Sequence, residues 1–454
     1  YTFTVGALPL AGPYTIDSTM ATGGTNFESF NAFGSALNAL GVSAAVDVSV
    51  AANIYNEQLS IGRYSGASST NTLTIDGGNS ATISHDQSIR NSTVTLEGAS
   101  WVTVKNMTIE TTGTLDAWGI RIFDSAHHIT IDSNMFLMPI GSNSDVAGVN
   151  VSSDEASDIG QGDNAYNLTI SNNLFNGGER SISIYGSFTS SARNHNLSVV
   201  NNTMYNAADN GLYITGQDTV TISGNIVDSL VNSASDGIYV ADLENFIISG
   251  NYSNAGDNGF DSDDLNFDNA VTVNSEISNN MFIGGDDALF MDDVENINIF
   301  HNSCYAEDWA LKLNDDLNLD IRNNIFYSVD DHALNSDDGI VNTMDNNIFY
   351  TGGTADLIEF GTSNYLDLAA FQTGEPTINA NSLQGDPLFL ANGIDLHVQG
   401  TLANDVGDNT VGITVDYDGD TRPLAPSTTV DIGADEYYAD FAEPRVHPFN
   451  YWDV

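Results

Sequence analysis

The sequence predicts an all-β chain folded as a single right-handed parallel β-helix, a solenoid of about a dozen coils of roughly 22–29 residues each. One short phrase recurs as SNNMF, FHNSC, RNNIF and DNNIF. The third residue of each phrase is an asparagine, and the intervals are 22, 22 and 23 residues between Asn280, Asn302, Asn324 and Asn347. Each unit also holds two short alternating segments, such as GLYI and VTISGN, which indicate strands with one buried face.

The same asparagine position can be followed toward the N-terminus. It recurs at Asn251, Asn225, Asn202, Asn173, Asn134 and, least clearly, Asn106. Each of these residues falls at a turn after a strand. Because identical turns stack in a solenoid, the side chains are expected to hydrogen-bond along its axis as a ladder.

Acidic residues dominate the charge of the chain. Among 454 residues, 61 are acidic and 10 are Lys or Arg, which gives a net charge of −51. Such a surface repels nucleic acid and anionic membranes, so neither is an expected partner. It suits a saline environment, and a plain solubility coat explains it equally well. Cys304 is the only cysteine, so a disulfide within the chain is excluded.

Residues 1–44 are expected to form an N-terminal strand and a capping helix. The helical stripe consists of Phe27, Phe30, Phe33, Leu37 and Leu40. Thr25 or Asn26 is the expected N-cap, and Gly41 is the expected stop. A helix ahead of the first coil covers the open end of the core. The chain begins at Tyr1 without Met, as expected of a processed chain or of a piece of a longer protein.

Residues 45–363 are assigned to the coils, with long insertions at 154–165 and 186–195 that should emerge as loops. The repeat then fades, and residues 364–436 are expected to cap the C-terminal end of the β-helix. Residues 437–454 have no alternation and many aromatic residues. They are interpreted as an aromatic tail packed on a neighbour, or as a linker.

Several stretches support a resemblance. The N-terminal GPYTIDSTMATGGTNFESF, the SNNMF-type coils and the closing DPLF, DYDGDTRP and DIGADEY resemble secreted right-handed parallel β-helix repeat proteins of Bacteroidota, cargo of the type IX secretion system. We do not expect any stretch of this sequence to form the separate sorting domain of that group. The resemblance implies an extracellular or cell-surface location, in a group that mixes adhesins, surface proteins and carbohydrate-active enzymes.

The middle residues of the first strand in each coil should point outward and form one column, about 4.8 Å apart per coil. In chain order they are Arg121, Asn150, Ser183, Tyr213, Tyr239, Asp261, Phe290, Lys312, Asn335 and Glu359. Arg121, Tyr213, Tyr239, Phe290 and Glu359 are the candidate substrate-binding residues, because aromatic rings stack on sugars and charged groups orient them. The alternative is an ordinary solvated sheet face.

No single catalytic constellation stands out. If the protein is an enzyme, the candidates are Lys312, Asp287 and Asp261: a lyase needs a base and a cation, and a glycoside hydrolase needs two carboxylates. The alternative for Lys312 is a structural counter-charge among many aspartates. Gly285-Asp286-Asp287 is similar to one signature of pectin hydrolases with this fold, but the His and Arg-Lys signatures of that group are missing.

The acidic residues that follow the first strand in successive coils are candidate Ca²⁺ ligands, since Ca²⁺ accepts six to eight oxygens in flexible geometry. They are Asp263, Asp264, Asp292, Asp293, Asp315, Asp316, Asp337 and Asp338. Hydrated Na⁺ around an unstructured acidic face is the alternative. The motif DYDGDT (Asp416, Asp418, Asp420) also alternates carboxylates, but it lacks the spacing of an EF-hand, and a turn explains it as well.

Two functions follow from these observations. The first is an extracellular, non-catalytic surface protein, an adhesin, stalk or assembly subunit stabilised by Ca²⁺ or high salt, whose partners are copies of itself, other surface proteins or glycans. The second is a secreted polysaccharide lyase or glycoside hydrolase that uses the outer face of the first sheet. An organic cofactor and direct membrane insertion are not expected.

Overall fold

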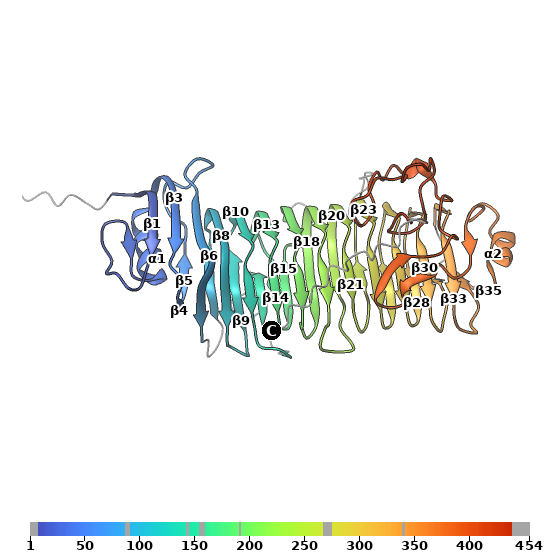
Figure 1. The fold of residues 1–454 in the computed structure, drawn as a ribbon, viewed down its shortest axis with the longest axis horizontal. Coiled ribbons are helices and arrows are strands. Elements are labelled where there is room, and N and C mark those ends of the chain that lie inside the picture. Colours follow the sequence, from blue (N-terminus) through green and yellow to red (C-terminus); the bar gives the residue numbers. More distant parts are fainter. Residues whose placement is uncertain are drawn as a thin grey trace, which may run out of the picture.

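The computed structural model describes residues 8–86, 91–141, 145–153, 159–189, 192–266, 275–337 and 341–437. The chain winds into a parallel β-solenoid of about 11 turns, which confirms the predicted fold class (Figure 1). Three sheets run along the solenoid, and the long strands β6, β8, β18 and β20 each bend from one sheet into the next.

The first sheet carries the predicted outward column. Its strands are β5 (Leu59–Ile61), β7 (Asn91–Glu97), β9 (Ala117–Phe123), β12 (Ala147–Val151), β15 (Arg180–Tyr185), the first halves of β18 (Asn210–Ser223) and β20 (Ile238–Ser249), β22 (Phe260–Asp263), β25 (Asp287–Asp292), β28 (Trp309–Asn314), β31 (Leu334–Ser336) and β34 (Ile358–Phe360).

The second sheet follows the first around each coil. It contains β2 (Asn26–Phe27), β1 (Leu10–Ile16), β3 (Val42–Val50), the first halves of β6 (Leu73–His85) and β8 (Ser100–Thr111), β10 (Ala126–Asp132), β13 (Ala165–Ser171), β16 (Asn194–Val200), the second halves of β18 and β20, β23 (Ser275–Ser278), β26 (Ile297–Phe300), β29 (Asp320–Arg322) and β32 (Thr343–Asp345).

The third sheet completes the coil. It contains β4 (Ile54–Asn56), the second halves of β6 and β8, β11 (Met135–Leu137), β14 (Leu174–Asn176), β17 (Thr203–Tyr205), β19 (Ile226–Asp228), β21 (Tyr252–Asn254), β24 (Met281–Gly284), β27 (Ser303–Ala306), β30 (Ile325–Ser328), β33 (Ile348–Thr351) and β36 (Leu383–Gln384).

The asparagine ladder is present between the second and third sheets. Each Nδ2 donates to the Oδ1 of the next asparagine at 2.9–3.1 Å, through Asn134, Asn173, Asn202, Asn225, Asn251, Asn280, Asn302, Asn324 and Asn347. All nine side chains are buried. Asn106 does not join the ladder, because Met107 takes the equivalent position and donates its N–H to Asn134, while the Nδ2 of Asn106 donates to Asp76.

Helix α1 (Phe30–Leu40) lies at the N-terminal end of the core, as predicted (Figure 1). Phe30, Phe33 and Leu37 are fully buried, and Gly41 ends the helix with a positive φ of 68°. The predicted N-cap is wrong: Ser29 caps the helix by accepting from the Ala32 N–H. Asn26 instead pairs with Thr15 of β1, so the chain is still extended at that point.

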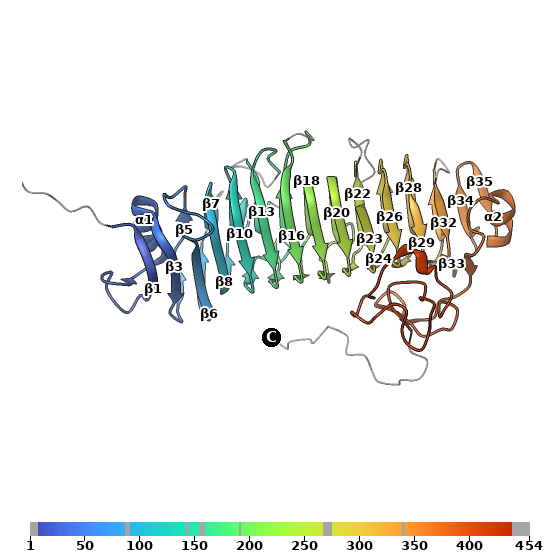
Figure 2. The ribbon, with the colours of Figure 1, turned by 90° about the horizontal axis from the view of Figure 1, so that it is seen from above.

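The expected C-terminal cap divides into two parts. Helix α2 (Leu368–Gly374) follows β35 (Ser363–Tyr365) and packs Phe371 against Phe360 at the C-terminal end of the solenoid. Residues 385–437, here called the return segment, do not cap that end. They turn back along the outside of the solenoid, as Figure 2 shows.

The return segment packs on the outer face of the third sheet. It contains the antiparallel pair β37 (Phe389–Ala391) and β38 (Asp395–Val398) and a short 3-10 turn at Asn409–Val411. Leu396 and Ile432 pack in one apolar cluster with Tyr252 and Ile325 of the solenoid. Tyr437 is the last described residue, so the predicted tail at 438–454 lies outside the described residues, as does the start of the chain at 1–7.

Within the part of the chain that the structure describes, neither helix has the length or apolar run needed to cross a membrane.

Candidate functional site

The predicted outward column is confirmed in register. Consecutive partners across the first sheet are Arg121–Asn150, Asn150–Ser183, Ser183–Tyr213, Tyr213–Tyr239, Tyr239–Asp261, Asp261–Phe290, Phe290–Lys312, Lys312–Asn335 and Asn335–Glu359. The alternation of period two in each strand fixes which residues point outward, and the ladder fixes how the coils align.

Aromatic rings form a stacked row near the middle of this face. The rings of Tyr213 and Tyr239 are 4.8 Å apart and nearly parallel, and Tyr185 stacks on Tyr213 at 6.2 Å. The guanidinium of Arg180 lies over the Tyr213 ring at 4.3 Å. Because Tyr213 and Tyr239 are only half-buried, the row offers a flat, partly accessible apolar surface.

Carboxyl groups gather next to the tyrosines. Asn258 donates to Asp236 at 3.0 Å, and Asp261 and Asp287 lie on the two following strands, β22 and β25. Burial is the main cause that raises the pKa of Asp261 to about 7 and of Asp236 to about 6, and the neighbouring carboxylates raise both further. Such carboxyls can hold or release a proton near neutral pH.

Lys312 and Asp287 form an ion pair with an N–O distance of 3.6 Å. The ammonium also lies over the rings of Trp309 and Phe290, at 4.3 and 4.7 Å. Burial nevertheless raises the pKa of Asp287 to about 7, against the opposing charge of Lys312. Its Oδ1 is buried without a hydrogen-bond partner among the described residues. These contacts fit the counter-charge interpretation of Lys312.

The N-terminal end of the column is less accessible than its middle. Arg121 is only 7% exposed and stacks against Trp118 and Phe123. Asn150 and Ser183, which separate Arg121 from the tyrosines, are fully buried. At the other end Glu359 accepts a hydrogen bond from Asn335 at 2.9 Å. The partly accessible residues of the predicted binding column are therefore Tyr213, Tyr239, Asp261, Phe290, Lys312 and Glu359, with the buried Asn335 between the last two.

Part of the predicted acidic ladder does come together. Carboxylate oxygens of Asp263, Asp264 and Asp293 lie within 4.8 Å of one another, and Asp292 is the strand partner of Asp263. Burial, followed by repulsion from Asp264 and Asp292, raises the pKa of Asp263 to about 6. Asp264, Asp293 and Asp315 each occupy a left-handed turn after their strand, with φ of 54°, 51° and 52°.

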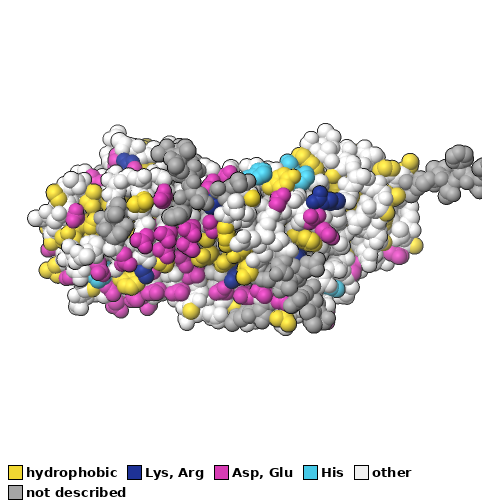
Figure 3. Space-filling view, turned by 180° about the vertical axis from the view of Figure 1, so that it is seen from behind, with side chains coloured by type: hydrophobic (Ala, Val, Ile, Leu, Met, Phe, Trp, Pro, Cys, Tyr) yellow, Lys and Arg dark blue, Asp and Glu magenta, His cyan; other side chains and the backbone are white. Residues whose placement is uncertain are grey.

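The other predicted cation ligands are placed differently. Asp316 is fully buried and accepts a hydrogen bond from the Val294 N–H at 3.0 Å, so its carboxylate closes a turn inside the coil. Asp315 and Asp337 are not part of the three-carboxylate group. Asp338 lies outside the described residues. Figure 3 shows that acidic side chains gather over the C-terminal coils on the face in view.

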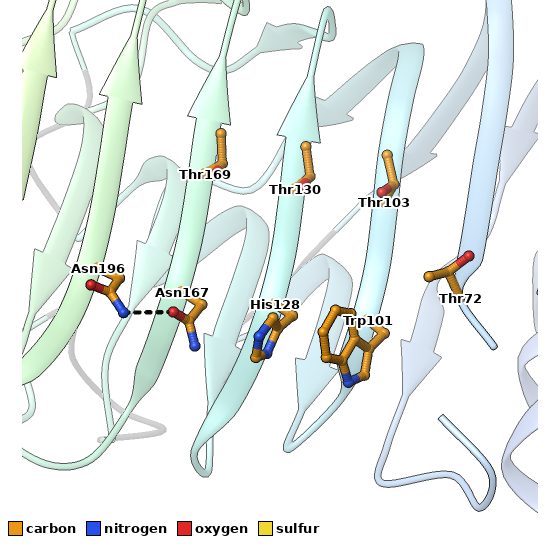
Figure 4. A pocket seen from close by; sticks show the side chains of 8 residues that line it. All are labelled: Thr72, Trp101, Thr103, His128, Thr130, Asn167, Thr169 and Asn196. Atoms are coloured by element: carbon orange, nitrogen blue, oxygen red, sulfur yellow. Dashed lines mark hydrogen bonds between the residues drawn. The ribbon is translucent and has the colours of Figure 1, made fainter. Parts of the chain in front are cut away.

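A hollow lies on the outer face of the second sheet, with a volume of about 390 Å³ (Figure 4). Its lining comes from successive strands and consists of Thr72, Trp101, Thr103, His128, Thr130, Asn167, Thr169 and Asn196. The rings of Trp101 and His128 stack at 3.8 Å. This hollow could not be predicted from the repeat pattern, because it assembles from one or two residues of each of several coils.

Sequence reasoning also missed Asp236, Asn258 and Tyr185 in the first sheet. Asp236 and Asn258 each lie two residues before the first apolar residue of their strand, as Asn210 does in DNGL. Comparing that position between coils could have found them. Tyr185 lies two residues after Ser183 on the same face of β15, in the next outward column.

Comparisons with known proteins place the chain near β-helix proteins. A lacto-N-biosidase of family GH136 from Eubacterium ramulus is 12% identical, with 77% of this chain and 67% of that one covered and a TM-score of 0.43. The pectate lyase Pel9A is 11% identical, with 95% and 98% covered and a TM-score of 0.41. The surface adhesin PfbA of Streptococcus pneumoniae is 12% identical, with 74% and 88% covered and a TM-score of 0.35.

Similarities with so low a sequence identity and TM-score assign no activity to the chain. No family model matches the sequence, and no curated protein matches it. The predicted kinship with Bacteroidota proteins and the type IX route therefore has no support at the sequence level and stays a prediction.

Proposed function

We propose that this protein is an extracellular surface protein of the adhesive kind that holds a glycan chain along the outer face of its first sheet. The observation that carries the proposal is the stacked row Tyr185–Tyr213–Tyr239, which continues directly into the carboxyls around Asp261. Flat aromatic surfaces pack on the apolar faces of sugar rings, and adjacent carboxyls accept hydrogen bonds from sugar hydroxyls.

The repeat spacing supports a polymeric ligand. Neighbouring strands present equivalent groups about 4.8 Å apart, so one face offers several consecutive contacts to an extended chain. The net charge of −51 favours neutral or cationic glycans over anionic ones, because the acidic face repels a polyanion.

Glycan arrays followed by affinity electrophoresis test the proposal. Tyr213→Ala and Tyr239→Ala should each weaken binding about tenfold or more, equivalent to roughly 1.4 kcal/mol. Tyr166→Ala is the matched control: it removes a tyrosine that stacks between His127 and His195 on the second sheet. Equal binding by all three variants and the unchanged protein would refute this assignment of the face. Loss only in the control would move the ligand to the second sheet.

Cleavage of the bound glycan is the second candidate function. The buried Oδ1 of Asp287, without a hydrogen-bond partner among the described residues, and the raised pKa values of Asp261 and Asp287 favour it. A protonated carboxyl next to an ionised one is the arrangement a general acid and base need. In a lyase, Lys312 would neutralise a uronate carboxylate.

Product release from a polysaccharide panel separates the two functions. If the protein cleaves, Asp287→Asn and Lys312→Ala should each abolish release of reducing ends while binding persists. An unsaturated product, detected by its ultraviolet absorbance, identifies a lyase. Full activity in both variants excludes these catalytic assignments, and binding without any release across the panel supports the adhesive function.

A further inference from the structure

The return segment brings three potential metal ligands together on the outside of the third sheet. They are His397 on β38, Asp418 in the turn formed by DYDGDT, and Asp435 in DIGADEY. One donor atom from each lies within 4.8 Å of the other two. Asp435 is only 4% exposed, whereas the side chain of Asp418 is 34% exposed. The group is thus reachable from solvent on one side.

Hydrogen bonds hold the backbone around the three ligands in place. Asp416 accepts hydrogen bonds from the N–H groups of Asp420 and Glu436, at 2.8 and 3.1 Å. The Tyr417 N–H donates to the carbonyl of Ala434 at 2.8 Å. These bonds join the two loops side by side and hold Asp418 and Asp435 next to each other. Of the three alternating carboxylates in DYDGDT, Asp416 therefore serves the fold, and Asp418 faces the histidine.

His397 is oriented by a neighbouring carboxylate. Its Nδ1 is hydrogen-bonded to Asp395, which leaves Nε2 as the donor atom for a metal. Nε2 is buried, has no hydrogen-bond partner among the described residues, and lies 3.5 Å from Oδ2 of Asp418. A carboxylate behind the imidazole is the outer-shell arrangement that metal-binding histidines commonly have.

We propose that His397, Asp418 and Asp435 bind a divalent first-row transition-metal ion of the Zn²⁺ type. Two ligand atoms on a tetrahedral zinc ion, each about 2.0–2.1 Å from the metal, are separated by roughly 3.3 Å, close to the observed 3.5 Å between Nε2 and Oδ2. One imidazole and two carboxylates also suit this class of ion better than Ca²⁺, which prefers six to eight oxygens.

A metal ion bound here would link three passes of the return segment, which has little regular secondary structure. Its bound form should therefore be more resistant to unfolding than its metal-free form.

Titration of the full-length, metal-free protein with Zn²⁺ and Co²⁺ tests the site. Calorimetry should show one saturable Zn²⁺ site, and Co²⁺ should give the visible absorption of a tetrahedral complex with nitrogen and oxygen ligands. Both signals should be lost in Asp418→Asn, which changes a partly exposed side chain, and in His397→Gln. Circular dichroism confirms that each variant is folded.

Asp405→Asn is the matched control. It removes the same charge from an exposed residue of the return segment, whose side chain accepts from the adjacent Asn404, and both signals should persist. Zn²⁺ binding of unchanged stoichiometry in Asp418→Asn and His397→Gln would overturn the site. The absence of saturable Zn²⁺ binding, or a site that takes Ca²⁺ in preference, would overturn it equally.

Discussion

At the scale of single residues, the buried asparagines hold the coils in register. The Oδ1 of Asn280 accepts from both the backbone N–H and the Nδ2 of Asn251, at 2.9 Å each, and its own Nδ2 donates to Ile248 and to Asn302. One side chain thus bonds buried polar groups of the coil before it and of the coil after it. Leaving a buried donor unpaired costs more free energy than one hydrogen bond contributes to stability. A shifted coil would leave such donors unpaired, so the ladder fixes the alignment of the coils as well as stabilising them.

The first prediction concerns this ladder. Asn280→Ala should lower the free energy of unfolding by about 2–4 kcal/mol, because it leaves buried donors of Asn251 without an acceptor. Asn342→Ala is the control, since Asn342 donates to Asn318 in an exposed position and its loss should cost well under about 1 kcal/mol. Urea denaturation measures both. Equal urea midpoints for the two variants would show that a buried ladder asparagine contributes no more to stability than an exposed one.

The second prediction concerns Asp261. Because burial raises its pKa to about 7 from an ordinary value of 3.8, the folded protein binds this proton more tightly than the unfolded chain does. The folded state therefore loses stability as the pH rises from about 4 to about 7. Asp261→Asn, which keeps the neutral form, should raise Tm at about pH 8 and flatten the fall in Tm between about pH 5 and pH 8.

The exposed Asp47 on β3 supplies the control for that experiment. Asp47→Asn removes the same formal charge from an exposed site on the second sheet, so it should leave the slope of Tm against pH close to that of the unchanged protein. If Asp261→Asn and Asp47→Asn gave the same slope, the proton on Asp261 would not be coupled to folding.

The direction in which each residue points could be predicted, whereas its accessibility could not. Alternation within GLYI, GIYV and ALKL correctly identified Tyr213, Tyr239 and Lys312 as outward neighbours, because a strand has only two faces. Outward does not mean exposed, however. Asn150 points outward and is fully buried, and Asp316 is a turn residue whose carboxylate is used inside the coil. The groups that pack around each position decide its accessibility, and they differ from one coil to the next.

At the scale of elements, the acidic turns after β22 and β25 lead to the third prediction. Ca²⁺ should bind between Asp263, Asp264 and Asp293, because three carboxylates within 4.8 Å repel one another and a divalent cation relieves that repulsion. Millimolar Ca²⁺ should raise Tm by several degrees, and Asp264→Asn with Asp293→Asn should remove most of that shift.

Asp315→Asn is the matched control, since Asp315 occupies the equivalent left-handed turn one coil further on but does not belong to the group. Its shift with Ca²⁺ should equal that of the unchanged protein. A shift produced equally by Mg²⁺ and retained in the double variant would indicate diffuse screening, the alternative in which hydrated ions surround an unstructured acidic face.

The return segment was predicted to cap the end of the solenoid, but it packs on the side of the third sheet. Arg422 holds it there. The fully buried guanidinium pairs with Glu436 at 2.7 Å and donates to the Gly433 carbonyl and to Asn279 of the solenoid. The contact between Arg422 and Asn279 joins residues 143 positions apart, in two segments of the chain that share no repeat. Period and alternation, which located the coils and α1, carry no information about such a contact.

The fourth prediction follows from that pair. Arg422→Ala should destabilise the docked return segment by about 3–5 kcal/mol, because it leaves the carboxylate of Glu436 buried without its partner. Hydrogen exchange should accelerate across residues 385–437 and remain slow in the asparagine ladder. Asp405→Asn again serves as the control. Uniform acceleration along the whole solenoid would show instead that the segment and the coils unfold as one unit.

At the scale of the whole molecule, charge is distributed unequally along the axis. Residues 1–200 carry 17 acidic and 6 basic residues, a net charge of −11, and residues 201–454 carry 44 and 4, a net charge of −40. In a solenoid each coil contacts mainly its neighbours, so stability is a sum of local terms. Self-repulsion should therefore weaken the C-terminal coils more than the N-terminal ones.

The fifth prediction is that salt stabilises the two halves unequally. Raising NaCl from about 0.1 M to about 1 M shortens the screening length from about 10 Å to about 3 Å, which is less than the spacing between neighbouring strands. Hydrogen exchange should slow strongly in the coils after residue 201 and little in those before it, so the N-terminal half is an internal control. Sucrose at equal osmolality, which does not screen charge, should slow both halves alike. If NaCl also slowed both halves alike, the acidic surface would act on solubility alone, and the dependence on saline surroundings would lose its physical basis.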